Sequence, residues 1–110
     1  MAHTYNATQK IIVNVTAEES VVDKLVSDIS KLEQHDAEYE YDADTNEYVV
    51  YIYLEGSVKY YPSHSWYDPD EYEYDEVFVG DDDYDWVRNG YFKDYDLEIE
   101  SIVIKDIEYR

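Results

Sequence analysis

Cysteine is absent from this sequence of 110 residues, and glycine and proline are scarce, with three and two occurrences. Without cysteine there is no disulfide framework, no thiolate chemistry and no cysteine-ligated metal site. Three scattered glycines leave no loop that could cradle a phosphate. Because 45% of the residues are hydrophobic, the chain can bury a core, and we expect a folded domain rather than an acidic disordered tail.

Basic residues are also few, with 8 Lys and Arg against 28 Asp and Glu, which gives a formal net charge of -20. The excess lies in residues 33–87, where Lys59 is the one base among 18 acids. Without a basic patch, direct binding of nucleic acid or of an anionic membrane is disfavoured. Crowding like charge into one folded region is destabilising, so we expect the acidic region to have a function.

Long apolar runs and a signal peptide are absent as well. We therefore expect a cytoplasmic protein, in the host cell cytoplasm if a phage encodes it. The length favours one domain over residues 1–110, with its acidic surface concentrated in 33–87.

The first third of the chain predicts a strand followed by a helix. Tyr5 to Val15 alternates in hydrophobicity, and Ala17 to Gln34 has apolar residues at helical spacing. Thr16 is the expected N-cap, with Glu19 as its capping-box partner. The apolar face of the helix comprises Val21, Val22, Leu25, Ile29 and Leu32.

After His35 the pattern changes to period two, which predicts strands. Glu38 to Asp42 and Tyr48 to Leu54 form a predicted hairpin that Gly56 ends, with Val58 to Tyr61 as a short continuation. Pro62 to Pro69 reads as a loop. The remaining predictions are a strand over 71–79, a loop or single helical turn over 84–91, and a last strand over 95–109 with a bulge at 100–101. This predicts an α+β fold, in which one amphipathic helix packs on an antiparallel sheet of about four to five strands in the order β-α-β-β-β-β.

Two five-residue stretches are identical, Glu38 to Asp42 and Glu71 to Asp75, both reading EYEYD. On a strand, the acids would line one face and the tyrosines the other. Alternate residues lie about 6.7 Å apart on a strand. Successive phosphates on one DNA strand rise about 3.4 Å along the axis, and with rotation they are roughly 7 Å apart. Each stretch therefore predicts a row of carboxylates at phosphate spacing, and two rows on one face would form a double row.

The acids around these stretches and the aromatic residues beside them are the candidate partner-binding residues, since Tyr and Trp are preferred anchors at interfaces. They are Glu38, Glu40, Asp42, Tyr67, Asp68, Asp70, Glu71, Glu73, Asp75, Glu76, Asp81, Asp82, Asp83, Tyr84, Asp85 and Trp86.

Three other interpretations stay open at this stage. The acids could form an ordinary solvated face of a sheet, or a weak divalent-cation site at Asp81 to Asp85 could belong to a structural domain. No EF-hand loop is present, because the segment starting at Asp42 lacks both the glycine and the final glutamate. An acidic interaction module could bind a basic host protein without imitating DNA. We expect no catalytic residues, no metal and no cofactor, since nothing near His3, His35 or His64 resembles a catalytic motif.

The size, the charge, the absence of cysteine and the acids Glu38, Glu40, Asp42, Glu71, Glu73 and Asp75 make the chain resemble a group of small DNA-mimic inhibitors. Phages and mobile elements carry such proteins against host defences, among them anti-restriction proteins, anti-CRISPR proteins and uracil-DNA glycosylase inhibitors. The resemblance implies a non-enzymatic inhibitor that occupies the basic DNA-binding channel of a host nuclease or CRISPR effector. The partner would be that basic protein, with no direct binding of nucleic acid or membrane, and a homodimer is left open.

Overall fold

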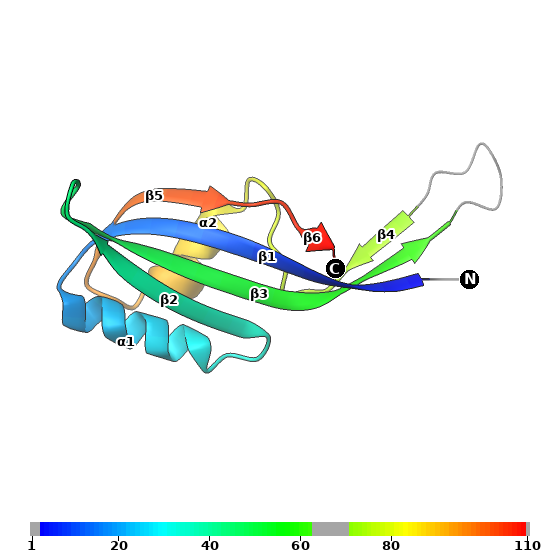
Figure 1. Cartoon of the computed structure of the whole chain (residues 1–110), viewed down its shortest axis with the longest axis horizontal. Helices are drawn as coiled ribbons and strands as arrows, with labels where there is room; N and C mark the ends of the chain where they lie inside the picture. The colour runs from blue at the N-terminus through cyan, green and yellow to red at the C-terminus, as the bar shows by residue number, and fades with distance from the viewer. Residues whose placement is uncertain (1–2, 63–70, 110) are drawn as a thin grey trace.

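The computed structural model describes residues 3–62 and 71–109, which form one antiparallel sheet with helices on one face (Figure 1). The elements in chain order are β1 (His3–Thr16), α1 (Glu19–Ser30), β2 (His35–Asp42), β3 (Glu47–Tyr61), β4 (Glu71–Tyr74), α2 (Tyr84–Val87), the π-helix η1 (Arg88–Phe92), β5 (Glu98–Ile104) and β6 (Glu108–Tyr109).

The predicted fold of one helix on four to five strands in the order β-α-β-β-β-β is wrong. The described residues contain six strands and two α-helices, and α2 and η1 interrupt the strand order between β4 and β5. The segment predicted as a loop or single turn at 84–91 becomes helical because it places Val87, Tyr91 and Phe92 in the core. The predicted last strand divides into β5 and β6.

The two long strands β1 and β3 form the centre of the sheet. They pair without interruption from His3 opposite Tyr60 to Val15 opposite Tyr48. On the edge of β3 that faces away from β1, β2 pairs with the first part of β3 and β4 with its last part. On the edge of β1 that faces away from β3, β5 pairs with the last part of β1 and β6 with its middle. The sheet extends beyond the helices as a narrow arm made of β4, the end of β3 and the start of β1 (Figure 1).

Strict alternation along β1 and β3 places the core on one face of the sheet. The side chains of Ile11, Val13 and Val15 are fully buried, as their alternation predicts, and so are those of Val50, Ile52 and Leu54. We call this the core face, and the opposite face the outer face. The predicted hairpin of Glu38–Asp42 with Tyr48–Leu54 is confirmed by the pairing of β2 with β3.

Helix α1 packs on the core face through Val22, Leu25 and Ile29. It is shorter than the predicted 17–34, and Leu32 lies beyond its end with 48% of its surface exposed. The predicted capping by Thr16 is wrong, because Thr16 is still extended in β1 and pairs with Glu98. The N-cap residue is Glu18, which makes no side-chain capping bond.

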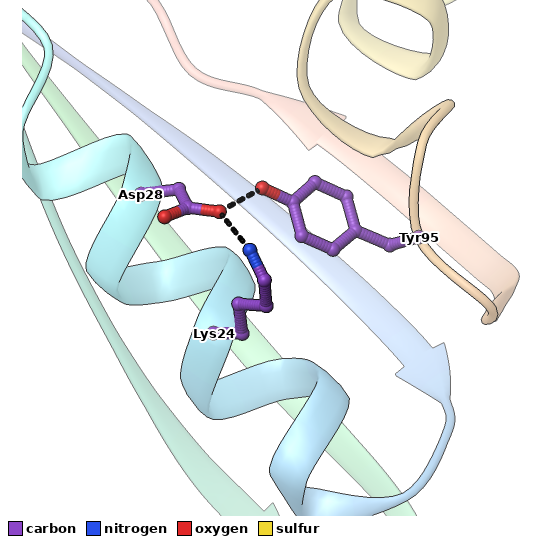
Figure 2. Close-up of polar contacts among 3 residues, drawn as sticks. All are labelled: Lys24, Asp28 and Tyr95. Atoms are coloured by element: carbon purple, nitrogen blue, oxygen red, sulfur yellow. Dashed lines mark hydrogen bonds and ion pairs between the residues drawn. The ribbon is translucent and has the colours of Figure 1, made fainter.

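A second contact joins α1 to the chain after η1. The Tyr95 hydroxyl donates to Asp28 Oδ2 at 2.5 Å, and Lys24 Nζ lies 3.2 Å from the same oxygen (Figure 2). These bonds stabilise the charged carboxylate, so they lower the pKa of Asp28, with the Tyr95 bond as the largest cause. The same bond raises the pKa of Tyr95 to about 12.

The remaining predicted boundaries are partly correct. The bulge at Glu100–Ser101 is confirmed, since Asn14 pairs with Ser101 and Val15 with Ile99, which leaves Glu100 as the extra residue. The strand predicted over 71–79 ends at Tyr74. Gly56 does not end the hairpin strand, because β3 continues to Tyr61. Within residues 3–62 and 71–109, no helix has the length and apolar character needed to cross a membrane.

Candidate partner-binding surface

The four carboxylates of β2 line one edge of the outer face. Their partners on β3 are odd-numbered residues, whose side chains point away from the core. The register places Tyr53 opposite Asp36, Tyr51 opposite Glu38, Val49 opposite Glu40 and Glu47 opposite Asp42. Glu38 and Glu40 are exposed and Asp42 is half-buried, so the row predicted from the first EYEYD stretch lies at the surface.

The carboxylates of β4 continue this row on the same face. Glu73 lies opposite Lys59 and Glu71 opposite Tyr61, and these β3 residues are odd-numbered too. Since β2 and β4 share one edge of β3, the two EYEYD stretches lie end to end and not side by side. The expected double row is therefore not formed. The acids make a single line of two runs, which spans about 46 Å from Asp42 to Glu71 at strand spacing and is interrupted for about 20 Å between Asp36 and Glu73. We call this line the acidic edge: Asp36, Glu38, Glu40, Asp42, Glu71 and Glu73.

Tyrosines of β3 hold three of these carboxylates by hydrogen bonds that repeat along one diagonal. The hydroxyl of Tyr51 donates to Glu40 Oε1 at 2.5 Å, that of Tyr53 to Glu38 Oε1 at 2.6 Å, and that of Tyr61 to Glu73 Oε2 at 2.9 Å. In each case the acceptor is two residues further along its strand than the residue directly opposite. The glutamate side chains are thereby fixed in a regular array.

These bonds also change the pKa of the tyrosines that donate them. The bond to Glu38 raises the pKa of Tyr53 to about 12, with burial as a smaller cause. The bonds to Glu40 and Glu73 likewise raise the pKa of Tyr51 and of Tyr61. Each tyrosine therefore stays protonated as a donor at neutral pH.

The donor tyrosines Tyr51, Tyr53 and Tyr61 were not among the predicted site residues, whose aromatic members were Tyr67, Tyr84 and Trp86. Tyr51 and Tyr53 could have been found from the alternation of Tyr48 to Leu54, which places them opposite the apolar face. The prediction that acids and tyrosines of EYEYD take opposite faces is confirmed on β2. Tyr39 lies on the core face, where its hydroxyl reaches Glu19 and Asp23 of α1 at 3.4 and 3.5 Å.

Asp75 does not belong to the acidic edge. Its Oδ2 accepts bonds from the Ser57 backbone N–H at 2.8 Å and from Gln34 Nε2 at 3.4 Å. Ser57 lies where β3 passes from pairing with β2 to pairing with β4. Asp75 thus satisfies the unpaired backbone at this junction, and its role is structural.

The aspartates after Gly80 lie on the other side of the sheet from the acidic edge. Their segment contributes Val79 and Val87 to the core, so it covers the core face. Asp83 accepts a bond from the Gly80 N–H at 3.0 Å, which closes the turn. The exposed residues here are Glu76, Asp81, Asp82, Asp83, Tyr84, Asp85 and Trp86. The predicted residues are therefore divided between two faces. Tyr67, Asp68 and Asp70 fall outside the described residues.

Among residues 3–62 and 71–109, no three His, Asp or Glu side chains are grouped so that they could hold a metal ion. His35 Nε2 lies 2.6 Å from the Tyr91 hydroxyl, and its Nδ1 lies 2.7 Å from the carbonyl oxygen of Glu33. His35 therefore connects the start of β2 to η1, which is a structural contact.

The chain matches no protein-family model, no curated protein and no solved structure.

Proposed function

We propose that this protein is a non-enzymatic DNA mimic that occupies the basic DNA-binding channel of a host nuclease or CRISPR effector. The observation that carries the proposal is the shared edge of β3, because it places the glutamates of both EYEYD stretches, together with Asp42, on one face in one line. Alternate positions on a strand are about 6.7 Å apart, close to the roughly 7 Å between phosphates of one DNA strand.

The charge of this face supports the proposal further. Strands β2, β3 and β4 carry eight carboxylates, all at outer-face positions, against the single base Lys59. The tyrosine hydroxyls hold three of the glutamates in fixed places, which lowers the ordering cost of binding. Long-range attraction would steer this face to a groove lined by Lys and Arg, and binding should weaken steeply with salt.

The site of action in this proposal is the cytoplasm of a bacterial host, with the protein encoded by a phage or a mobile element. Because the acidic edge is a single line, it imitates the phosphates of one strand. The proposed inhibitor would therefore block the part of the channel that follows one backbone, and it need not fill both grooves of a duplex.

Capture from a bacterial host lysate, followed by competition with duplex DNA, tests the proposal. We expect the retained protein to be a DNA-binding protein that duplex DNA releases in proportion to its concentration. Retention that duplex DNA leaves unchanged would overturn DNA mimicry and would favour an acidic module that binds a basic protein elsewhere. Retention that is equally strong at low and high salt would overturn the electrostatic mechanism.

A further inference from the structure

The arm of the sheet exposes a set of tyrosine rings on the side that continues the core face. Tyr74 lies opposite Val58, and Tyr109 lies opposite Ala7, so both rings cover buried residues of the arm. They nevertheless keep 46% and 49% of their surface exposed, because the helices do not extend over the arm (Figure 1). Tyrosines exposed in this way are typical anchors at interfaces.

These rings contact one another in a connected series. The rings of Tyr72 and Tyr74 are stacked with centroids 6.3 Å apart, and the hydroxyls of Tyr74 and Tyr109 are 3.3 Å apart. The ring of Tyr5 meets that of Tyr109 edge-on at 6.4 Å. The bond to Tyr74 raises the pKa of Tyr109 to about 12, so this hydroxyl is neutral at neutral pH. The series therefore presents a connected group of aromatic rings.

A cleft of about 530 Å³ opens between these rings and two loops. Its lining includes Tyr74, Tyr109, Phe78, Ile107, Asp81 and Asp106. Gln9 forms the floor, and its amide is engaged by the chain. Its Nε2 donates to the carbonyls of Val79 and Lys105, and its Oε1 accepts from the Val79 N–H at 2.8 Å. The side-chain charges that the lining offers to a ligand are the two aspartates, both exposed.

Aromatic faces beside carboxylates select an organic cation. A guanidinium group fits best, because it is flat, stacks on aromatic rings and bonds carboxylates in a forked geometry. An anion would meet two negative charges and is excluded. The outer face already shows such a contact within the chain, since Lys10 Nζ lies 4.7 Å from the centroid of the Tyr51 ring.

We propose that this cleft receives an arginine side chain of the partner protein. The inference rests on the proposed function, which supplies a partner with a basic channel. Glu71 and Glu73 lie on the outer face of β4, and Tyr72 and Tyr74 lie on the opposite face. A channel that encloses the arm therefore contacts the acidic edge with one wall and the arginine cleft with the other.

The first test is an NMR titration of the full chain with N-acetyl-arginine amide. We expect saturable shifts confined to the backbone amides that line the cleft, at Gly80, Asp81, Ile107 and Tyr109. The citrulline analogue has the same shape without the charge and should produce no saturable shift. Non-saturating shifts spread over the whole acidic surface, or equal binding of the citrulline analogue, would overturn the inference.

Matched variants separate ring contacts from general charge. Tyr74→Ala with Tyr109→Ala keeps the net charge and should weaken arginine binding about fivefold or more, whereas Tyr74→Phe with Tyr109→Phe should retain it. The control, Tyr41→Ala, removes an exposed ring elsewhere and should leave the affinity unchanged. Asp81→Asn with Asp106→Asn should also weaken binding and tests the cleft without altering a ring. An unchanged affinity in the alanine and asparagine variants would contradict the proposal.

The titration needs no partner protein, so its outcome is independent of the capture experiment. Arginine binding at the cleft without DNA competition would leave the cleft intact and overturn the DNA mimic. DNA competition without arginine binding would overturn the cleft alone.

Discussion

Tyr53 donates to Glu38 at 2.6 Å, and this bond raises its pKa to about 12. Tyr95 and Tyr109 reach about the same value through bonds to Asp28 and Tyr74, and Tyr91 reaches it through burial. At the scale of single residues, the protein therefore uses the tyrosine hydroxyl as a neutral donor that fixes carboxylates and other phenols in place.

A pH dependence follows from these raised values. The ordinary pKa of tyrosine is about 10, so between about pH 10 and 12 the unfolded chain loses protons that the folded chain retains. The contribution of these tyrosines to the free energy of unfolding is complete below about pH 10 and is lost as the pH rises to about 12. Urea denaturation at a series of pH values should show this loss. The prediction would be contradicted if the tyrosinate absorbance of the folded protein rose in a single transition near the ordinary tyrosine pKa of about 10.

Gly56 permits a close approach of two segments. A Cβ at this position would lie 2.8 Å from Asp75 Oδ2 and 3.1 Å from Phe78 Cε2, and both are packed against the arm. Gly56→Ala should therefore destabilise the fold by about 1–3 kcal/mol, as overpacking does. Thermal or urea denaturation measures the change.

Gly90 provides the control for Gly56, because its added Cβ would meet nothing closer than 3.5 Å, at the ring of Trp86. Gly90→Ala lies in a helical segment and should be neutral or stabilising by up to about 1 kcal/mol. Equal destabilisation by both substitutions would show that close packing at Gly56 is not the cause.

At the scale of elements, the parts of the fold that alternation or helical spacing specifies could be predicted. Local pattern specifies both faces of β1, the β2–β3 hairpin, the position of α1 and the bulge at Glu100. The start of α1 and its cap could not be predicted, because β1 continues through Thr16 and keeps that residue extended. Helix α2 and η1 were predicted only as a loop or a single helical turn, because their short sequence has little helical periodicity and packing of Val87 and Phe92 decides their conformation.

The candidate site was predictable only where it depends on the local alternation of residues along one strand. Period two shows that Glu38, Glu40 and Asp42 share a face, and it shows the same of Glu71 and Glu73. It does not show that β2 and β4 pair with one edge of β3, which is a long-range choice of partner. The structural role of Asp75 and the placement of Asp81 to Asp85 on the other face could not be predicted either, because both depend on long-range contacts.

The dependence of α1 on its buried face can be tested with one residue. Leu25 is fully buried between the helix and the sheet, so Leu25→Ala should lower the free energy of unfolding by about 2–5 kcal/mol. Leu32→Ala is the control, because Leu32 is 48% exposed beyond the helix and should change it by less than about 0.5 kcal/mol. Urea denaturation of both variants measures the difference, and similar losses would contradict the packing described for α1.

At the scale of the whole molecule, the protein is long and narrow, with extents of 55 × 24 × 23 Å. The acidic edge runs along its length on the outer face, and the helices with the segment of Asp81 to Asp85 cover the other face. Most of the net charge of -20 belongs to residues 33–87. The arrangement makes a rod with a line of fixed charges on one edge, and that geometry is what the proposed mimicry of one DNA strand requires.

The affinity of two matched variants for the captured partner tests this central claim most directly. Glu38→Gln with Glu40→Gln removes two charges from the acidic edge and keeps an oxygen acceptor for Tyr53 and Tyr51. Glu76→Gln with Asp82→Asn removes two charges from exposed positions off the edge. At one ionic strength, we predict that the first variant binds roughly tenfold or more weakly and that the second stays within about twofold of the unmodified protein. Equal losses in the two variants would show that net charge alone drives binding, and would contradict the account.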